Sequence, residues 1–403
     1  MIQKLSGKEL IAISKEFGTP LYVYHAEKIT EQYQKFCNAF SGIDFQVFYA
    51  CKALTNVNIL KHLLSVGSSV DCSSINEVKL AFHAGFPKEK ILYTSNGISF
   101  EEIVEAKELG IRINIDSISN LKKFGAQFGF SYPIGIRLRP NIMGGGNLKI
   151  STGHDKSKFG IPVTQLDEVL AIVKEYNLCI QNLHIHTGSD LKDVDIWLKG
   201  MQVLFDLIPS FPNLQAIDLG GGFKVSYHDD EKEMDINLLA EAIKKEFSSI
   251  KTSEGKPFQI WFEPGKYLVS EAGYFLTEVN VIKETASANF VHVNSGFNHL
   301  IRPMFYDAYH KIKNLSNPNG TEKKYAIVGN ICETDTFAWG REIAEIKEAD
   351  VLVFYNAGAY GFEMSSNFNS RFKPAEVMMK NNKPYLIRKR DEFEDLLHNQ
   401  IEL

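Results

Sequence analysis

The sequence predicts an α/β protein: a (β/α)8 TIM barrel followed by a C-terminal β-sandwich or β-barrel domain. In roughly the first two thirds of the chain, eight apolar runs of strand length alternate with stretches of helical period. Alternating strands and helices form parallel sheets, and eight such strands close a barrel. After about Leu268 the alternation stops, and strand-like runs with Gly and Asn turns follow, as in β domains. We therefore expect an N-terminal segment over 1–24 that packs with the C-terminal domain, the barrel over 25–268, and the β domain over 269–403.

The expected elements follow in order along the chain. A helix over Gly7–Phe17 precedes a strand at Leu21–Tyr24, and a helix over Glu27–Phe40 leads into the barrel. The expected barrel strands are Val47–Ala50, Ser69–Val70, Ile91–Tyr93, Ile113–Ile115, Ile134–Leu138, Leu183–Ile185, Ala216–Leu219 and Gln259–Phe262. The helices between them are Asn56–Ser65, Ser74–Ala84, Phe100–Leu109, Ile118–Phe128, Pro162–Tyr176, Val194–Ile208 and Ile236–Ile250. Later strands are expected at Val279–Ile282, Phe290–Val293, Tyr325–Val328 and Val351–Tyr355, and Gly144–Gly146 is expected to be a loop.

Composition excludes several classes of protein. The net charge is −5 and no basic block is present, so neither nucleic acid nor an acidic membrane surface is an expected partner. No apolar run approaches the roughly 20 residues of a membrane span, and no signal-peptide core is found. The five cysteines are odd in number and form no C-x-x-C motif. We therefore expect a cytoplasmic protein with free thiols and no metal site.

Polar or glycine residues follow almost every expected barrel strand. Any one of them could be a helix cap, as Asp116 or Ser74 would be. Eight in succession at the carboxyl ends of barrel strands are better explained as an active site, because barrel enzymes place their sites there. In strand order these positions are Lys52, Asp71, Ser95–Asn96, Asp116, Arg139, His186, Gly220–Gly222 and Glu263.

The residue types at these positions favour a pyridoxal phosphate site. A lysine held partly out of water is easier to deprotonate, as a Schiff-base lysine requires, whereas Lys52 alone could simply end a strand. Gly220–Gly222 offers backbone N–H groups to a phosphate, although a glycine triplet is equally compatible with a flexible turn. Glu263 could meet the pyridine nitrogen and keep the ring protonated, and His186 could stack on the ring. His184 lies on the same side as His186, one layer deeper, so we expect it to be a core residue.

The chain resembles the diaminopimelate decarboxylases, members of the alanine-racemase-like group of pyridoxal-phosphate enzymes that includes ornithine and arginine decarboxylases. The resemblance covers essentially the whole chain. Each motif is weak alone, but their order is specific. The motifs are Tyr49–Lys52, Ile150–Gly153 with Lys158–Gly160, His186–Ser189, Gly220–Gly222, Glu263–Lys266, Leu300–Pro303 with Tyr306–His310, Ile331–Glu333, Ala357–Gly361 and Met364–Asn367.

The resemblance implies a role for each matching residue. Lys52 would carry the internal aldimine, and Cys332 would return a proton to the substrate carbon. His186 would stack on the cofactor and Glu263 would pair with its ring nitrogen, and these four would form the catalytic set. The cofactor-binding set would be Lys52, Asp71, His186, Ser189, Gly220, Gly221, Gly222, Glu263, Pro264, Gly265, Lys266 and Tyr360, of which Ser189, Gly222, Gly265 and Tyr360 would hold the phosphate. The substrate-binding set would be Lys266, Arg302, Tyr306, Glu333 and Tyr360.

The same resemblance implies a homodimer with shared active sites, because Cys332 and Glu333 would reach the site of a second copy of the chain. Two positions depart from the family pattern. Lys266 replaces the arginine of the E-P-G-R motif, so a positive charge is kept but the bidentate fork is lost. Ser73–Glu77 replaces S-G-G-E and places a bulkier residue beside the barrel mouth.

The reaction expected from the resemblance is decarboxylation of meso-2,6-diaminopimelate to L-lysine and CO2. Alternatives are a decarboxylase of the same group acting on another carboxylate-bearing amino acid, such as a siderophore precursor, and a non-catalytic relative that binds a regulator. Such relatives lose cofactor residues, whereas Lys52, Glu263 and Cys332 are all present. A racemase is disfavoured, because alanine racemases place arginine, not glutamate, at the pyridine nitrogen.

Overall fold

The computed structural model describes residues 2–142, 157–247, 250–253 and 255–403. The expected loop at Gly144–Gly146 and the motif Ile150–Gly153 lie outside the described residues. The chain divides into two compact units. One contains Gln32–Val225 and Lys232–Tyr267, and the other contains Met1–Glu31, Ser226–Glu231 and Leu268–Leu403. Among the described residues, no helix has both the length and the apolar character that a membrane crossing requires.

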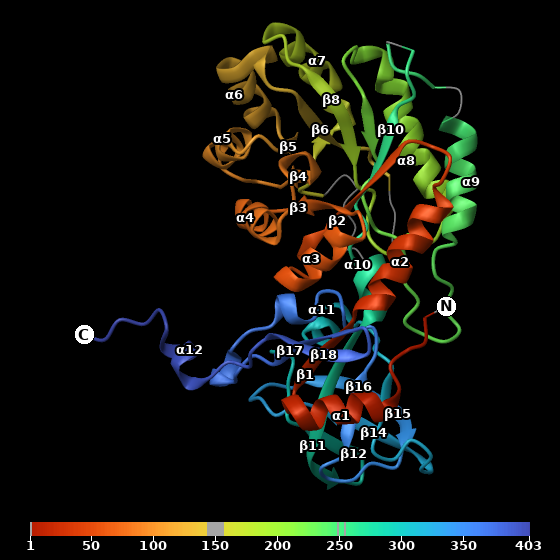
Figure 1. The fold of residues 1–403 in the computed structure, drawn as a ribbon, viewed down its shortest axis with the longest axis vertical. Coiled ribbons are helices and arrows are strands. Elements are labelled where there is room, and N and C mark those ends of the chain that lie inside the picture. Colours follow the sequence, from red (N-terminus) through yellow and green to blue (C-terminus); the bar gives the residue numbers. More distant parts are fainter. Residues whose placement is uncertain (1, 143–156, 248–249, 254) are drawn as a thin grey trace. The chain divides into compact units, whose positions relative to one another are not determined.

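The first unit is a closed parallel barrel of eight strands, as the sequence predicts (Figure 1). β2 pairs with both β3 and β10, and the pairing of β5 with β6 joins the remaining neighbours, so no barrel strand is left at an edge. A two-residue strand, β7 (Ile161–Pro162), pairs with β6 outside the ring. The barrel strands are β2 (Phe45–Ala50), β3 (Ser69–Cys72), β4 (Ile91–Thr94), β5 (Arg112–Ile115), β6 (Ile134–Arg139), β8 (Ile180–Ile185), β9 (Ala216–Asp218) and β10 (Gln259–Phe262).

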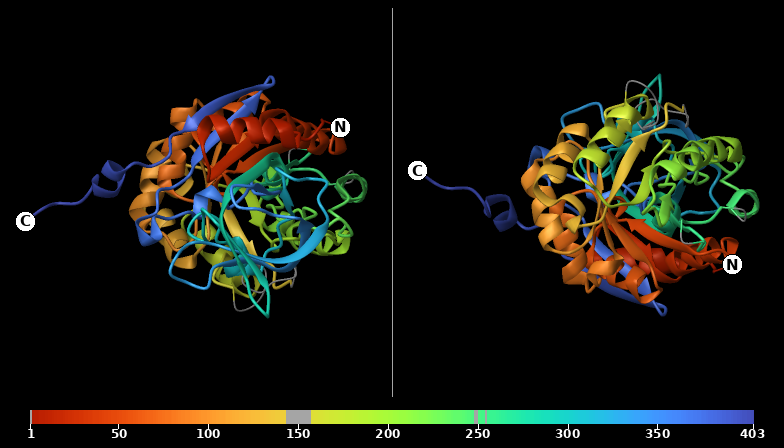
Figure 2. Two further views of the ribbon diagram at one scale, coloured as in Figure 1. Left: turned by 90° about the horizontal axis from the view of Figure 1, so that it is seen from below. Right: turned by 90° about the horizontal axis from the view of Figure 1, so that it is seen from above.

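Helices surround the barrel strands, as the views along the barrel show (Figure 2). Most of them begin at a side-chain cap. Ser74, for example, accepts a hydrogen bond from the Glu77 N–H and starts α4, which ends at Gly85 in the left-handed conformation. The helices are α2 (Ala26–Ala39), α3 (Val57–Ser65), α4 (Ile75–Ala84), α5 (Phe100–Glu108), α6 (Ile118–Phe128), α7 (Leu166–Glu175), α8 (Val194–Leu207) and α9 (Ile236–Phe247). The short helix α10 (Lys266–Val269) follows β10.

The barrel interior holds an apolar cluster and, toward the carboxyl end of the strands, a set of buried polar side chains. Phe48, Leu92, Ala216 and Trp261 form a buried cluster on β2, β4, β9 and β10. Side chains alternate along a strand, so the residues two positions later also face inward. On β4, β9 and after β10 these residues are Thr94, Asp218 and Glu263, and all three are buried. The period of the strands therefore directs polar groups into one end of the barrel.

The second unit is built on one branched nine-stranded sheet, in the order β15-β14-β12-β11-β1-β17-β18, with β16 paired to β11 and β13. β1 (Leu21–His25) pairs with β11 and β17, so the N-terminal strand is part of this sheet. α1 (Gly7–Phe17), which starts at a Ser6–Glu9 capping box, packs Leu10 and Ile13 into the same core. The later elements are β11 (Gly273–Glu284), β12 (Asn289–Val293), α11 (Arg302–Tyr306), β13 (Ile312–Asn314), β14 (Glu322–Val328), β15 (Thr336–Ala344), β16 (Val351–Phe354), β17 (Ala375–Lys380), β18 (Lys383–Arg388) and α12 (Phe393–Leu397).

The expected strands and helices of the barrel are confirmed, with ends that shift by a few residues. Five strands were not predicted from the sequence: β7, β13, β15, β17 and β18. β7 and β13 are too short to show a period, and β15 contains Gly340 at φ +62°, which interrupts the strand pattern. β18 is a partly exposed edge strand that begins with Lys383 and Pro384, residue types depleted in strands.

Candidate active site at the carboxyl end of the barrel

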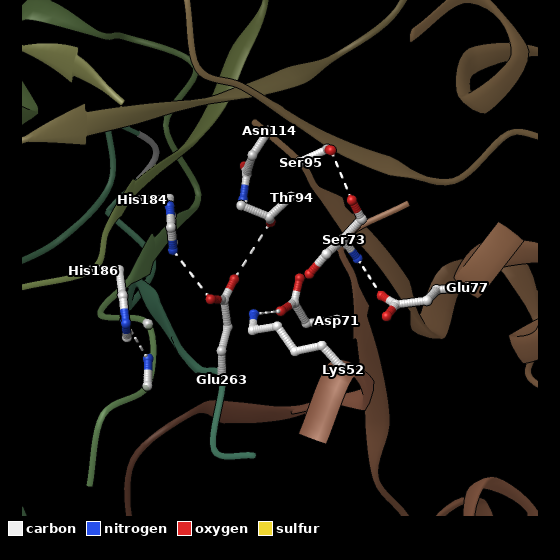
Figure 3. A network of polar contacts seen from close by, with 12 residues as sticks. Lys52, Asp71, Ser73, Glu77, Thr94, Ser95, Asn114, His184, His186 and Glu263 are labelled. Carbon is white, nitrogen blue, oxygen red and sulfur yellow. Dashed lines mark hydrogen bonds and ion pairs between the residues drawn. The ribbon is translucent and has the colours of Figure 1, made fainter. Parts of the chain in front are cut away.

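Side chains from five parts of the barrel meet at the carboxyl ends of its strands (Figure 3). Lys52 lies on a short 3-10 helix, Cys51–Ala53, directly after β2. Asp71 comes from β3, Thr94 from β4 and His184 from β8, while Glu263 follows β10. In Figure 3 the side chains of Lys52, Asp71 and Glu263 point toward one another. The sequence prediction that strand ends gather Lys52, Asp71 and Glu263 is therefore confirmed.

Lys52 forms an ion pair with Asp71. Its Nζ lies 3.3 Å from Asp71 Oδ2, and 44% of the lysine side chain is exposed against 1% for Asp71. Burial, and next the charge of Glu263, raise the pKa of Asp71 to about 7, although Lys52 opposes this. The other oxygen, Asp71 Oδ1, is buried with no hydrogen-bond partner in the described part of the chain. That Lys52 is easily deprotonated stays a prediction.

Glu263 is held as a buried carboxylate. His184 Nε2 lies 3.2 Å from Oε2, and the Thr94 hydroxyl donates to Oε1 across 3.4 Å. Burial alone would raise the pKa of Glu263, but its interactions with His184 and the positive charge of Lys52 outweigh burial and lower it. Because an ionised carboxylate only accepts hydrogen bonds, the Nε2 of His184 carries the proton. His184 is a buried, hydrogen-bonded core residue as expected, but its partner Glu263 was not predicted from the sequence.

Asp218 completes the buried network. It is fully buried, its Oδ1 accepts a hydrogen bond from the Gly220 N–H at 2.9 Å, and burial followed by the charge of Glu263 raises its pKa well above the usual range. One ligand atom from each of His184, Asp218 and Glu263 lies within 4.8 Å of the others, a spacing compatible with a metal ion. The hydrogen bonds to Glu263 and from Gly220 already engage these groups, which favours a polar network over a metal site.

The glycine triplet lies against the loop that follows β8. Gly220 and Gly222 have φ of +69° and +105°, and a Cβ on Gly222 would collide with the Gly188 carbonyl oxygen. The Gly221 N–H donates to His186 Nδ1 at 3.1 Å, and the Gly220 N–H is used by Asp218. The expectation that the whole triplet presents free donors was therefore wrong, because two of its three N–H groups are used within the chain.

Three backbone donors remain around this loop. The N–H groups of Ser189, Gly222 and Gly265 have no hydrogen-bond partner in the described part of the chain. Gly265 is also tightly packed, because a Cβ at this position would lie 3.1 Å from the Ala50 carbonyl oxygen. Open backbone N–H groups are suited to donate to a phosphate, and we call this set of three donors the phosphate cradle. The cofactor phosphate expected from the sequence fits this cradle.

The orientation of His186 follows from the same contacts. Nδ1 accepts from Gly221, so the proton of the neutral ring lies on Nε2. Enclosure of the ring, and next the charges of Arg137 and Lys52, lower the pKa of His186 to about 3. The ring is therefore neutral at physiological pH.

Lys266, the residue that replaces the family arginine, forms an ion pair with Asp190. Only 11% of the lysine side chain and 25% of the aspartate side chain are exposed. Asp190 was not identified from the sequence, although it directly follows the His186–Ser189 motif. The two residues neighbour Ser189 and Gly265 in the chain, so this ion pair borders the phosphate cradle. Pro264, between Glu263 and Gly265, is buried there, and its carbonyl accepts from the Ala50 N–H.

The remaining predicted residues belong to the other compact unit. Arg302 begins α11 and is 7% exposed, and Tyr306 ends that helix. Cys332 is an exposed free thiol whose Sγ accepts from Asn369 Nδ2 at 3.0 Å, and Glu333 is exposed beside it. Tyr360 is partly buried at φ +55°. Asn369, which was not identified from the sequence, also accepts a hydrogen bond from the Cys332 N–H at 2.8 Å.

A lysine, a buried carboxylate and a phosphate cradle at the mouth of such a barrel are typical of a pyridoxal-phosphate enzyme. Residues 26–270 match the family model described as "Pyridoxal-dependent decarboxylase, pyridoxal binding domain". The chain is 38% identical to the diaminopimelate decarboxylase of Methanothermobacter thermautotrophicus, over 98% of this chain and 95% of that one. It is 35% identical to that of Pseudomonas fluorescens, over 97% and 94%.

Solved structures agree with these sequence relatives. The diaminopimelate decarboxylase of Helicobacter pylori, complexed with L-lysine, matches with a TM-score of 0.88 and 31% identity, over 96% of this chain and 98% of that one. The enzyme of M. jannaschii in co-complex with L-lysine matches with a TM-score of 0.89 and 31% identity, over 98% and 94%. This chain therefore belongs to the diaminopimelate decarboxylase family of pyridoxal-dependent decarboxylases. Its cofactor is pyridoxal phosphate.

Proposed function

We propose that this chain decarboxylates meso-2,6-diaminopimelate to L-lysine and CO2, the last step of lysine biosynthesis. It is a pyridoxal-phosphate-dependent carboxy-lyase. The observation that carries the assignment is the similarity to diaminopimelate decarboxylases over nearly the whole chain. The Lys52–Asp71 ion pair and the buried Glu263 at the barrel mouth support it. Two of the similar solved structures contain L-lysine, the product of this reaction.

The residues of the barrel would bind and orient the cofactor. Lys52 would hold it covalently through Nζ, Glu263 would keep the ring nitrogen protonated, and His186 would stack on the ring. The bound cofactor supplies an electron sink for the electron pair left when CO2 departs. Ser189, Gly222, Gly265 and Tyr360 would hold the phosphate, with Asp71, Gly220, Gly221, Pro264 and Lys266 at its border.

The second set of residues would bind the substrate and move a proton. Arg302, Tyr306, Glu333, Lys266 and Tyr360 would bind the end of the substrate that does not react. Arg302 is a buried cation, and a substrate without a distal carboxylate would leave it unpaired at a cost of several kcal/mol. The Cys332 Sγ would return a proton to the carbon that loses CO2. An exposed thiol held by Asn369 suits this task, since a proton donor must reach its acceptor.

We further propose that the chain acts in the cytoplasm as a homodimer in which Cys332 and Glu333 of one copy complete the site of the other. An exposed Cys332–Glu333 loop supports this proposal, because the loop is open to contact by a second chain. In the same proposal residues 25–268 are the cofactor-binding domain, and residues 1–24 belong with the β domain of 269–403.

Product analysis tests the proposed function. Purified enzyme with pyridoxal phosphate is incubated separately with meso-diaminopimelate, L-ornithine and L-arginine, and amine products and CO2 are measured. We expect L-lysine and CO2 from diaminopimelate alone, and a borohydride-trapped cofactor on the peptide that contains Lys52. Lys52→Ala should abolish both signals, whereas Lys61→Ala, at an exposed position on α3, should abolish neither. Turnover of ornithine in place of diaminopimelate, or a label on another peptide, contradicts the assignment.

A further inference from the structure

Tyr227 belongs to a segment that leaves the barrel unit. Residues 226–231 follow the glycine triplet closely in sequence, yet they belong to the compact unit that contains Arg302. The Asn356 side chain donates to the Ser226 carbonyl oxygen at 2.7 Å and Lys311 binds Asp229 at 2.8 Å, so this segment is tied to that unit on both sides of Tyr227. Neither Tyr227 nor His310 has a role in the function proposed above.

Tyr227 and His310 both contact the guanidinium of Arg302. Arg302 NH1 lies 3.0 Å from the Tyr227 hydroxyl oxygen and 3.4 Å from His310 Nε2. The Tyr227 and His310 rings meet edge to face, with centroids 5.7 Å apart and planes at 85°. Arg302 and His310 are 7% and 2% exposed, so the three side chains form one packed cluster.

The direction of each hydrogen bond in this cluster follows from donor chemistry. A guanidinium only donates, so the Tyr227 oxygen accepts from Arg302. The hydroxyl proton of Tyr227 is then free to go to Ser270 Oγ at 2.9 Å, and Ser270 in turn donates to the Asn356 carbonyl oxygen at 3.3 Å. Each group therefore donates to the next, from the Arg302 guanidinium through the two hydroxyls to the Asn356 carbonyl oxygen.

The tautomer of His310 also follows from its hydrogen-bond partners. Its Nδ1 lies 2.9 Å from the Tyr355 carbonyl oxygen, which can only accept, so Nδ1 carries the proton and Nε2 presents a lone pair to Arg302. Burial, and next the charge of Arg302, lower the pKa of His310 to about 3. Both acceptors of Arg302 are therefore neutral.

These contacts fix the orientation of the Arg302 guanidinium without neutralising its charge. No carboxylate forms an ion pair with it in the described part of the chain. Its hydrogen bonds to Tyr227 and His310 both come from NH1, and its Cζ lies 5.0 Å from the centroid of the Tyr227 ring. The Nε and NH2 donors have no hydrogen-bond partner among the described residues. The side of a guanidinium that carries Nε and NH2 binds a carboxylate through two parallel hydrogen bonds.

We propose that Tyr227 and His310 are positioning residues that orient Arg302 toward the distal carboxylate of the substrate and so set specificity for an amino acid over a plain amine. This inference rests on the proposed role of Arg302. L-lysine keeps the unreacted end of diaminopimelate, with its amine and carboxylate, whereas 1,5-diaminopentane lacks the carboxylate. The ratio of their affinities therefore reports the contact that Arg302 makes.

The test measures dissociation constants of the holoenzyme for L-lysine and 1,5-diaminopentane by calorimetry, and kcat and KM for meso-diaminopimelate. Tyr227→Phe removes the acceptor oxygen but keeps the ring. We expect it to weaken L-lysine binding roughly tenfold, the scale of one hydrogen bond to a charged group, and to leave diaminopentane binding within about twofold. KM should rise by a similar factor, with kcat little changed. Tyr385→Phe, an exposed tyrosine on β18, is the control.

Two substitutions of His310 provide an independent check. His310→Gln can place an acceptor near the position of Nε2, whereas His310→Asn can keep only the donor toward the Tyr355 carbonyl. We expect Gln to retain the preference for L-lysine and Asn to lose it. Equal weakening of both ligands by Tyr227→Phe, or an unchanged preference in both Tyr227→Phe and His310→Asn, overturns the inference.

Arg302→Gln separates this inference from the proposed function. If Arg302→Gln leaves L-lysine affinity unchanged, the role proposed for Arg302 is wrong. If Arg302→Gln weakens L-lysine binding while Tyr227→Phe and His310→Asn do not, Arg302 binds the carboxylate without their help, and only the positioning role fails.

Discussion

The His184 imidazole donates a hydrogen bond to the Glu263 carboxylate, with 3.2 Å between Nε2 and Oε2 and both side chains buried. A buried carboxylate would ordinarily take up a proton, because burial disfavours charge. The donors His184 and Thr94 and the nearby charge of Lys52 offset that cost, so Glu263 keeps its negative charge away from bulk water. An anion held in this way is suited to keep a pyridine nitrogen protonated.

Replacing Glu263 by Gln should slow decarboxylation by on the order of 10² in kcat, because a neutral amide no longer stabilises the pyridine proton. Steady-state kinetics on the purified variant checks this, with circular dichroism to confirm the fold. Glu108→Gln, at an exposed position at the end of α5, is the matched control. A variant with nearly normal kcat would show that Glu263 has only a structural role.

We expect the Lys266–Asp190 ion pair to affect cofactor affinity, because removal of one partner leaves the charge of the other unpaired. Lys266→Met leaves the Asp190 carboxylate unpaired beside the phosphate cradle, and we expect the dissociation constant of pyridoxal phosphate to rise roughly tenfold. The double variant Asp190→Asn, Lys266→Met should bind nearly as well as the wild type, because neither charge is then left alone. Titration of apoenzyme, followed by absorbance, measures all three proteins. Additive losses in the double variant would show that the two charges act independently.

His299 should make the protein less stable in acid. Burial, and next the charge of Arg390, lower its pKa to about 4, against about 6.5 in an unfolded chain. The folded state therefore binds fewer protons than the unfolded state in this range, so stability is complete above about pH 6.5 and is lost as the pH falls toward 4. The loss from this one group is roughly 3 kcal/mol at the acid end.

Urea unfolding between pH 4 and 7 measures this pH dependence. His299→Gln should flatten the acid-side decline in unfolding free energy, even if the variant is less stable at pH 7. His398→Gln, at an exposed position after α12, is the control. His186 and His310 contribute in the same direction, so part of the slope should survive. An unaltered slope in His299→Gln would rule out this histidine as a source of the acid sensitivity.

A shared site predicts complementation between two inactive variants. Homodimers of Lys52→Ala and of Cys332→Ala should each be nearly inactive. After subunit exchange, about half of the dimers pair the two variants, and each holds one site with both residues intact, so about a quarter of wild-type activity should return. Native mass spectrometry confirms the exchange. Exchange without recovered activity would mean that Cys332 serves the Lys52 of its own chain.

The sequence by itself determined the barrel and the location of the site. Alternation of strand and helix periods requires a parallel sheet, and a parallel barrel brings all strand ends to one mouth. Lys52, Asp71 and Glu263 could therefore be placed together although they are far apart in the chain. Short or edge strands such as β13 and β18 escaped prediction, because their side chains carry little periodic signal.

Only the tertiary structure decided which polar groups are partners. His184 and Glu263 are 79 residues apart in sequence, Asp190 and Lys266 are 76 apart, and Tyr227 and Arg302 are 75 apart. The structure also showed that the N–H groups of Gly220 and Gly221 are used within the chain. A hydrogen bond depends on distances and angles of a few tenths of an ångström and a few tens of degrees. Residue type and spacing locate a strand end, but strand register, loop path and rotamer set that geometry.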